Sequence, residues 1–332
     1  MKSNVLMVVR KGEVAMVEQE LPPLGPKDVL VKVTKSLVSP GTERAWILGL
    51  ENTGGGENYP FKIHYAAAMV VQSIGPEVTT LVPGDRVSSY GTGHQTYDVV
   101  HEEKLVKIPD GVSDEHAAFG ALGYICMQGV RKARLEIGES CAIIGMGPIG
   151  QLAMQFSKVS GACPVIALDK DDGRLELALE CGADITINTG ADNWKEKLSE
   201  YDLEKGVAAT IESTGFPAAI QSALDITGYF GRVVMLGSTR GDCTINVYRD
   251  IHKKGLSVIG AHAFRVPETD NSPASWTCRK ELETFMYMLS KNKFEISKLV
   301  SLRVESKELV DVFYNRILKW DMDLIGVIVN WV

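Results

Sequence analysis

The feature that most constrains this chain is a glycine motif between a predicted strand and a predicted helix. In "AIIGMGPIGQLAMQ", Gly145, Gly147 and Gly150 follow the spacing G-x-G-x-x-G. The first glycine allows a tight turn, the second lets a phosphate approach the backbone, and the third lets the helix pack closely on the sheet. The helix N-terminus adds unpaired N–H groups and a partial positive charge. The motif therefore predicts a site for the pyrophosphate of a dinucleotide.

An acidic residue follows at the distance that such a site requires. The next predicted strand, "VIALD", ends at Asp169, nineteen residues after Gly150. A carboxylate there accepts hydrogen bonds from the ribose hydroxyls of NAD and repels the 2′-phosphate of NADP. Lys170 is adjacent and weakens this preference. We predict NAD(H), with a purely structural turn and a solvated Asp169 as the alternative.

The rhythm of the elements divides the chain into two parts. From residue 138 onward, strands such as "ESCAIIG", "CPVIALD" and "GRVVMLGS" alternate with helices, which indicates βαβ units and a parallel sheet. Residues 1–110 instead carry short strands with turn signals such as "LVPGDRV", typical of a sandwich or partial barrel. A length of 332 residues also favours two domains. We therefore expect an α/β protein with a β-rich domain and a doubly wound parallel-sheet domain.

Composition excludes several classes of function. The formal charge of −7 argues against nucleic-acid binding, and no apolar run approaches the roughly 18 residues of a membrane span. The N-terminus has no signal-peptide pattern, so we expect a cytoplasmic location. Six cysteines are scattered without any C-x-x-C pair, which argues against a zinc lobe and a disulfide framework.

The segments "VPGDRV", "EEKLVKIPDGVSDEHAA", "GMGPIG" and "STG", in this order, resemble the medium-chain dehydrogenase/reductase superfamily, nearest its zinc-type alcohol and polyol dehydrogenases. The resemblance implies a GroES-like catalytic domain from residues 1–117 and 297–332. It implies a Rossmann dinucleotide-binding domain from residues 118–296. It further implies a small-molecule substrate, and a homodimer or homotetramer that pairs through the edge strand "LSVIGA" of the Rossmann domain.

The zinc ligands of that family are largely missing. The usual C-G-T-D segment aligns with "PGTE", which places Pro40 where the first cysteine stands. The G-H-E segment aligns with "IHY", which keeps His64 but replaces its acidic neighbour by Tyr65. A further ligand position aligns with Ala121, and the cysteine-rich lobe after "GDRV" is absent. Because proline and alanine cannot coordinate zinc, we expect no bound metal.

Without zinc, a side chain must remove the proton of an alcohol substrate. His64 is the candidate general base, with a structural imidazole as the alternative. The resemblance makes Thr42 a proton-relaying hydroxyl, with a hydroxyl that caps the backbone as the alternative, and it places Tyr65 in the same cleft.

Four nearby residues have simpler interpretations. We expect Glu43 and Arg44 to form an ion pair, with a place in the lining of the same cleft as the alternative. We expect His94 and Tyr97 to be surface loop residues, with side chains that face the substrate as the alternative.

The predicted cofactor-binding residues belong to the glycine turn and to the carboxyl ends of the following strands. They are Gly145, Met146, Gly147, Pro148, Ile149, Gly150, Asp169, Lys170, Ser213, Thr214, Gly237, Ser238, Ala261 and His262.

Three functions are compatible with these features. The first is a zinc-independent, NAD-dependent dehydrogenase of a secondary alcohol, such as a sugar or polyol. The second is a zinc-free reductase of enones or quinones, which would favour NADPH. The third is a non-catalytic NAD-binding protein. The sequence identifies neither the substrate nor the direction of the reaction.

Overall fold

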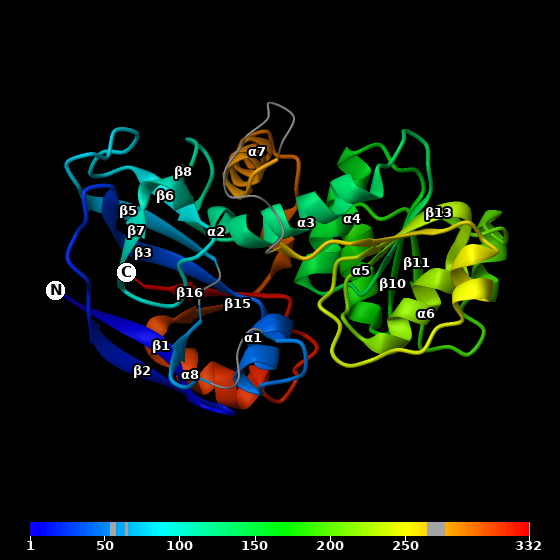
Figure 1. The fold of residues 1–332 in the computed structure, drawn as a ribbon, viewed down its shortest axis with the longest axis horizontal. Helices are drawn as coiled ribbons and strands as arrows, with labels where there is room; N and C mark the ends of the chain where they lie inside the picture. Colours follow the sequence, from blue (N-terminus) through cyan, green and yellow to red (C-terminus); the bar gives the residue numbers. More distant parts are fainter. Residues whose placement is uncertain (54–57, 64–65, 264–275, 332) are drawn as a thin grey trace. The chain divides into compact units, whose positions relative to one another are not determined.

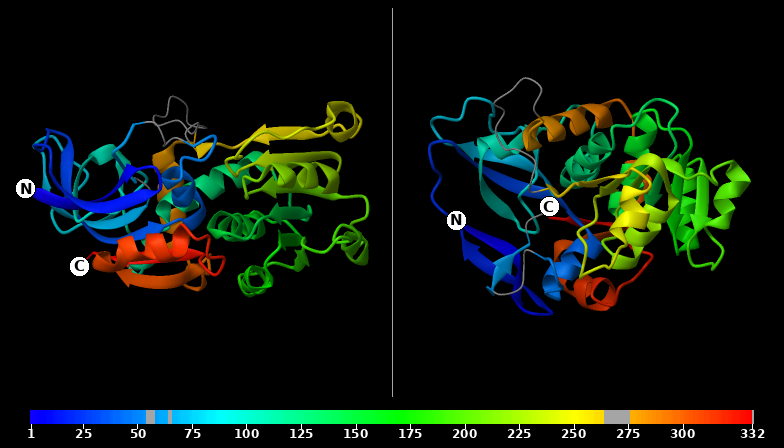
Figure 2. Two further views of the ribbon diagram at one scale, coloured as in Figure 1. Left: turned by 90° about the horizontal axis from the view of Figure 1, so that it is seen from below. Right: turned by 45° about the vertical axis from the view of Figure 1, so that its right-hand side comes forward.

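The structure is a computed structural model that describes residues 1–53, 58–63, 66–263 and 276–331. Two compact units divide it: Met1–Tyr124 with Pro267–Val332, and Ile125–Val266. Figure 1 labels many elements of both units, and Figure 2 shows the same ribbon, with the same colours along the sequence, from two further directions. Within the described ranges, no helix has the length and hydropathy needed to cross a membrane.

The first unit is rich in β-structure, as expected. Its larger sheet has the strand order β15-β16-β3-β5-β6-β8, with β7 paired to β3. These strands are β3 (Asp28–Val38), β5 (Ala67–Ile74), β6 (Arg86–Ser89), β7 (Tyr97–His101), β8 (Leu105–Lys107), β15 (Val300–Glu305) and β16 (Gly326–Asn330). A smaller sheet, ordered β2-β1-β4, contains β1 (Lys2–Arg10), β2 (Glu13–Glu20) and β4 (Phe61–Lys62).

The helices of this unit are short except for α7. They are α1 (Pro40–Ile47), α2 (Asp114–Ala117), α7 (Cys278–Ser290) and α8 (Leu309–Val312), while α3 (Gly120–Ala133) runs from the first unit into the second. Alternating apolar residues of β1, β3 and β5 form a core with the C-terminal residues Phe313 and Val327. This packing explains why a C-terminal segment joins the N-terminal strands.

The second unit is a parallel sheet with the strand order β11-β10-β9-β12-β13-β14. Numbered along the chain, this is the 3-2-1-4-5-6 order of a dinucleotide-binding fold, and every neighbouring pair is parallel. The strands are β9 (Cys141–Ile144), β10 (Val165–Asp169), β11 (Ile185–Asn188), β12 (Val207–Glu212), β13 (Thr227–Met235) and β14 (Ser257–Gly260). The helices are α4 (Pro148–Val159), α5 (Asp172–Glu180) and α6 (Pro217–Ile226). The predicted fold class is confirmed.

The second compact unit, Ile125–Val266, is shorter at both ends than the Rossmann domain expected at residues 118–296. The compact units group α7 with the β-rich unit. Its Phe285 packs so closely on Gly123 that a Cβ there would overlap the Phe285 ring, and its Met286 is buried. These contacts hold α7 on the β-rich unit although it follows the last strand of the parallel sheet in the chain.

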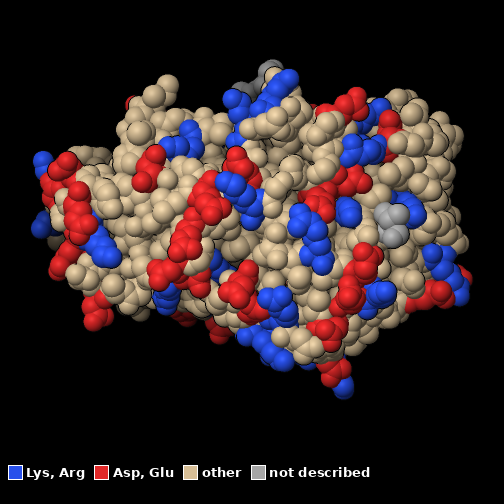
Figure 3. Space-filling view, turned by 180° about the vertical axis from the view of Figure 1, so that it is seen from behind, with Lys and Arg blue, Asp and Glu red and all other residues tan. Residues whose placement is uncertain are grey.

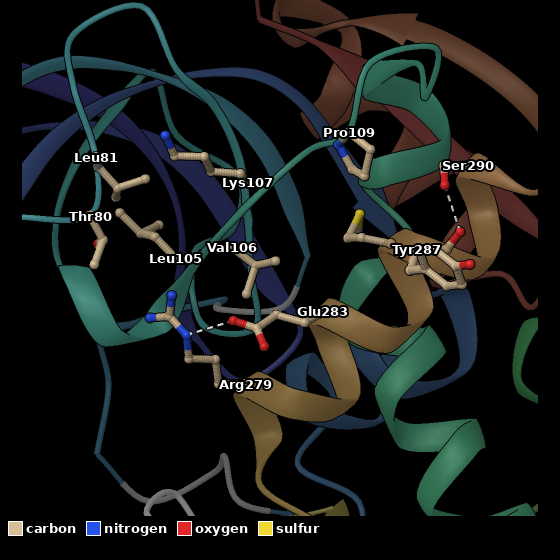
Figure 4. A pocket seen from close by; sticks show the side chains of 11 residues that line it. Thr80, Leu81, Leu105, Val106, Lys107, Pro109, Arg279, Glu283, Tyr287 and Ser290 are labelled. Carbon is tan, nitrogen blue, oxygen red and sulfur yellow. Dashed lines mark hydrogen bonds and ion pairs between the residues drawn. The ribbon is translucent and has the colours of Figure 1, made fainter.

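A groove lies between α7 and β8 in the first unit (Figure 4). Its volume is about 380 Å³, and Arg279 and Glu283 form an ion pair of 2.8 Å at its edge. The described residues that line it include none of the predicted site residues. On the face shown in Figure 3, acidic and basic side chains alternate, so this face has no extended basic surface of the kind that binds nucleic acid.

Candidate functional site

The glycine turn has the backbone geometry that its sequence predicts. Gly145 has φ +92°, a conformation that favours glycine, and its N–H donates to the carbonyl oxygen of Leu168 at 2.7 Å. A Cβ at Gly150 would overlap the carbonyl oxygen of Gly145 and lie 2.8 Å from its carbonyl carbon. Both glycines are therefore required by the protein's own packing.

Gly147 differs because its surroundings are open. It is the N-cap of α4, no side chain caps that end, and a Cβ built on it would meet no heavy atom within 4 Å. Pro148 is the next residue and starts the helix, as proline does at this position. An uncapped helix N-terminus beside open space fits a phosphate, which the first N–H groups can bind.

Asp169 ends β10 and is 8% exposed. Its carboxylate accepts hydrogen bonds from the N–H groups of Met146 at 2.5 Å, Lys170 at 2.7 Å and Asp171 at 3.1 Å. A carboxylate has about four acceptor positions, so one remains for a ribose hydroxyl. Asp169 therefore fits a ribose and, through Met146, also braces the glycine turn.

Ser213 and Thr214 come directly after β12 and complete the turn. The Ser213 hydroxyl donates to the carbonyl oxygens of Ile144 and Gly145 at 2.9 and 2.8 Å. Thr214 donates through its N–H (2.6 Å) and its hydroxyl to the carboxylate of Glu212. Ser213 thus holds the glycine turn in place, whereas Thr214 holds the carboxylate of Glu212.

Sequence reasoning missed Glu212. Its side chain is fully buried, and burial raises its pKa although the hydrogen bonds from Thr214 and Gly215 act in the opposite direction. The signal was present, because a carboxylate at the end of the buried strand "VAATIE" requires local hydrogen-bond donors.

The remaining predicted cofactor residues follow the next two strands. The Gly237 N–H donates to the carbonyl oxygen of Glu212 at 2.8 Å, and a Cβ there would lie 2.8 Å from the carbonyl carbon of Ser213. Ser238 is the exposed residue after it. Ala261 follows β14 and is buried, its N–H donating to the Met235 carbonyl oxygen at 3.0 Å, and His262 is exposed.

The expected metal-ligand positions lie in the first unit. Pro40 is the first residue of α1, and Ala121 is buried on α3. His64 and Tyr65 lie outside the described residues. Neither Pro40 nor Ala121 has an atom that binds zinc, so these positions do not fit a zinc ion. In the part of the chain that the structure describes, no three His, Cys, Asp or Glu side chains converge to hold a metal.

The predicted ion pair between Glu43 and Arg44 is wrong. The Glu43 carboxylate is fully buried and contacts Nε2 of His94 at 3.0 Å. Arg44 instead donates to the Leu318 carbonyl oxygen at 3.3 Å and lies over the ring of Trp320, 4.8 Å from its centroid. Adjacent residues of a helix point to different faces, which is why the two charges separate.

The prediction that His94 is a surface residue is also wrong, since it is 1% exposed. Tyr97 begins β7 as a half-buried strand residue, and its N–H donates to the Ser3 hydroxyl at 3.0 Å. Thr42 is half-buried in the first turn of α1.

Comparisons with known proteins agree with this geometry. A family model described as "Zinc-binding dehydrogenase" matches residues 148–276. The L-threonine 3-dehydrogenase of Shewanella woodyi is 30% identical over 289 residues, which cover 76% of this chain and 82% of that enzyme. The D-guloside 3-dehydrogenase of Escherichia coli is 31% identical over 233 residues, 68% of this chain and 65% of that enzyme.

Solved structures share the whole fold. A protein from Sinorhizobium meliloti 1021, described as a zinc-binding dehydrogenase and bound to NADP, superposes with a TM-score of 0.85 at 22% identity, covering 99% of both chains. An identity of 30% over most of the length of both chains indicates membership of the same family and not only a shared fold. The chain therefore belongs to the zinc-binding dehydrogenase family of NAD(P)-dependent medium-chain oxidoreductases.

Proposed function

We propose that this protein is a zinc-independent, NAD(H)-dependent dehydrogenase that interconverts a secondary alcohol and a ketone on a sugar or polyol. Asp169 carries the choice of cofactor, because a buried carboxylate at the end of β10 accepts a ribose hydroxyl and repels a 2′-phosphate. Asp171 and Asp172 follow it directly and add negative charge, while Lys170 opposes them. The glycoside named in D-guloside 3-dehydrogenase supports the substrate class.

The residues of the glycine turn would hold the cofactor. The open N-cap at Gly147 and the first N–H groups of α4 bind the pyrophosphate, and Asp169 binds the ribose. When bound, NAD supplies the carbon that accepts or returns a hydride. Gly145, Gly150 and Ser213 keep the turn in the shape that admits the phosphates.

The proton of the alcohol needs a separate acceptor. Pro40 and Ala121 supply no metal ligand, so we assign the acceptance of the proton to His64, with Thr42 as relay and Tyr65 beside it. An imidazole titrates near neutral pH, whereas a tyrosine acts as a base only if its pKa falls by several units.

Turnover tests the proposal. The purified protein is mixed with NAD⁺ or NADP⁺ and a panel of sugars, polyols and other secondary alcohols, and in the reverse direction with NADH or NADPH and ketones, enones and quinones. We expect NAD⁺ reduction with a polyol or sugar at an undiminished rate after chelator treatment. Loss of activity with chelator, recovered with zinc, would refute zinc independence.

His64→Ala tests the proton acceptor. It should lower kcat by roughly 10²–10⁴-fold and leave the affinity for NADH unchanged. The control is His101→Ala, because the side chain of His101 is 40% exposed on β7 and has no assigned role. An unchanged kcat in His64→Ala would move the role to Tyr65.

The main alternative is a zinc-free reductase of enones or quinones. The NADP bound to the S. meliloti protein of the same fold is the observation that favours it. Faster turnover of enones with NADPH than of any alcohol with NAD⁺ would establish this alternative. Cofactor binding without any turnover would indicate a non-catalytic protein.

A further inference from the structure

A network of hydrogen-bonded, buried polar side chains crosses the core of the first unit. Nε1 of Trp331 donates to the Ser36 hydroxyl at 2.8 Å, which lies 2.7 Å from Nδ1 of His94. Nε2 of His94 lies 3.0 Å from Oε2 of Glu43, and Oε1 of Glu43 accepts the N–H of Ser39 at 2.9 Å. The five residues are each no more than 6% exposed.

With Glu43 as a carboxylate, every link is satisfied by a neutral His94 that carries its proton on Nε2, and also by a protonated His94 whose Nδ1–H donates to the Ser36 oxygen. An indole N–H only donates, so Ser36 accepts from Trp331 and, in the neutral form, its own hydroxyl proton is free to donate to Nδ1 of His94. Nε2 of the neutral imidazole then carries the other proton and donates it to the Glu43 carboxylate. In both arrangements Nε2 of His94 donates to Glu43, which ends the network as a buried carboxylate with two hydrogen-bond donors.

The geometry of Ser36, His94 and Glu43 has the residue types of a hydrolytic triad, but it cannot act as one. The Ser36 hydroxyl is 0% exposed, sits within the paired strand β3 and already accepts from Trp331. A nucleophile must reach its substrate. We therefore interpret this hydrogen-bond network as one that holds elements of the first unit together.

The element held most directly is α1. It has eight residues, begins with Pro40 and Gly41, and the side chain of its N-cap Ser39 makes no capping hydrogen bond. Such a short helix is not stable by itself and depends on tertiary contacts. Glu43 supplies one, because its carboxylate accepts the Ser39 N–H at the positive end of the helix and binds His94 on the other side.

Thr42 directly precedes Glu43 in this first turn. We propose that the Glu43–His94 pair is a positioning element that fixes α1, and with it the hydroxyl of Thr42, for the reaction. This proposal rests on the proposed function for the role of Thr42. The helix that the pair would anchor begins at Pro40, which stands where we expected a metal ligand.

Isosteric variants test the pair. In Glu43→Gln the amide oxygen can still accept the Ser39 N–H, but the amide NH₂ then faces the N–H of His94, so one buried donor loses its acceptor. His94→Gln removes the imidazole and leaves Glu43 without its partner. The matched controls are His101→Gln and Glu103→Gln, because His101 and Glu103 form a surface contact of 3.8 Å with side chains 40% and 73% exposed.

Hydrogen exchange of the α1 amides measures the anchoring directly. We expect residues 43–48 to exchange about tenfold faster in Glu43→Gln and His94→Gln, while β3 and β5 keep their protection. The control variants should match the wild type. If one core variant fails to fold, the other alone decides the outcome, since each of them breaks the contact between Glu43 and His94.

Kinetics with the substrate found in the panel test the consequence for Thr42. We expect kcat to fall about tenfold in the core variants, with the KM for NAD⁺ and the affinity for NADH unchanged. Unchanged exchange in α1, or equally increased exchange across the whole unit, overturns the proposal. Faster exchange in α1 with an unchanged kcat also overturns it, because Thr42 would then not depend on the pair.

Failure of the proposed function gives a different pattern. Wild-type protein would then show no turnover with any compound of the panel, whereas the exchange experiment still decides whether the pair holds α1.

Discussion

Replacing Gly147 by alanine separates cofactor binding from folding. Gly147 has φ −70° and ψ −174°, an extended conformation that any residue adopts, and a Cβ there meets no heavy atom within 4 Å. Alanine is a poorer N-cap than glycine, which costs about 0.5–1 kcal/mol. We therefore expect Gly147→Ala to fold and to unfold only a few degrees below the wild type.

The effect on the cofactor should be much larger. The new methyl group occupies the open space in front of the N-terminus of α4, where the phosphate would contact the backbone. A hydrogen bond to a charged group contributes about 1.5–3 kcal/mol, so the loss of one weakens binding about 10- to 150-fold. Titration of the protein with NADH, followed by the fluorescence of the nicotinamide, measures this affinity.

Gly150→Ala is the matched control with the opposite expectation. Its Cβ would overlap the carbonyl oxygen of Gly145, and backbone cannot move aside as a side chain can. We expect a loss of about 3 kcal/mol or more in the free energy of unfolding. If Gly147→Ala binds NADH within about twofold of the wild type, the phosphate does not approach the backbone at this turn, and the assignment of the site is refuted.

Four further predictions concern other parts of the molecule. Because Pro40 cannot bind a metal, elemental analysis of protein never exposed to chelators should find no stoichiometric zinc, and one zinc per chain would contradict this. Asp169→Ala should weaken NADH binding at least about tenfold and reduce the ratio of the affinity for NADH to the affinity for NADPH. Competitive titration measures both affinities, and tighter binding of NADPH than of NADH by the wild type would contradict the prediction. The hydrogen-bonded Arg232 holds the pKa of the Glu139 carboxyl below its ordinary value of 4.5. The pair therefore contributes stability at pH values above 4.5, and this contribution is lost as the pH falls through the folded-state pKa. Glu139→Gln should therefore show a smaller decrease of Tm on acidification than the wild type, and an equal decrease would count against the pair. Val258 is 44% exposed on the edge strand β14, so Val258→Lys should convert the proposed dimer to monomer in light scattering, whereas a monomeric wild type would end the dimer hypothesis.

The second unit could be predicted from the sequence because its signals are local. The strand "CAII" is apolar throughout and "VIALD" is apolar up to its terminal Asp169, since helices cover both faces of a parallel sheet. The spaced glycines and Asp169 all lie within one βαβ unit, so their relation can be read from the sequence. The hydrogen bond that the Met146 N–H donates to Asp169 required the structure, because it links the end of one strand to the neighbouring turn.

The buried polar network of the first unit could not be predicted, because its members are far apart in the sequence. Ser36, Glu43, His94 and Trp331 come together only when β3, α1, the segment before β7 and the C-terminus pack in one core. The glycine-rich surroundings of His94 are typical of an exposed loop. Its burial follows instead from tertiary contacts such as the hydrogen bond from the Leu6 N–H to its carbonyl oxygen at 2.8 Å.

At the start of α1, Pro40 stands where we expected the metal-ligating cysteine of the family to align. Pro40 occupies the first helical position, where its fixed φ favours the helix and its missing N–H leaves no donor unpaired. A cysteine thiolate would instead place a negative charge among residues that are buried and that already include the carboxylate of Glu43. Two such charges require a cation nearby. The proline at position 40 and the pairing of Glu43 with His94 are therefore mutually consistent, because His94 and the Ser39 N–H give one carboxylate two hydrogen-bond donors without a metal.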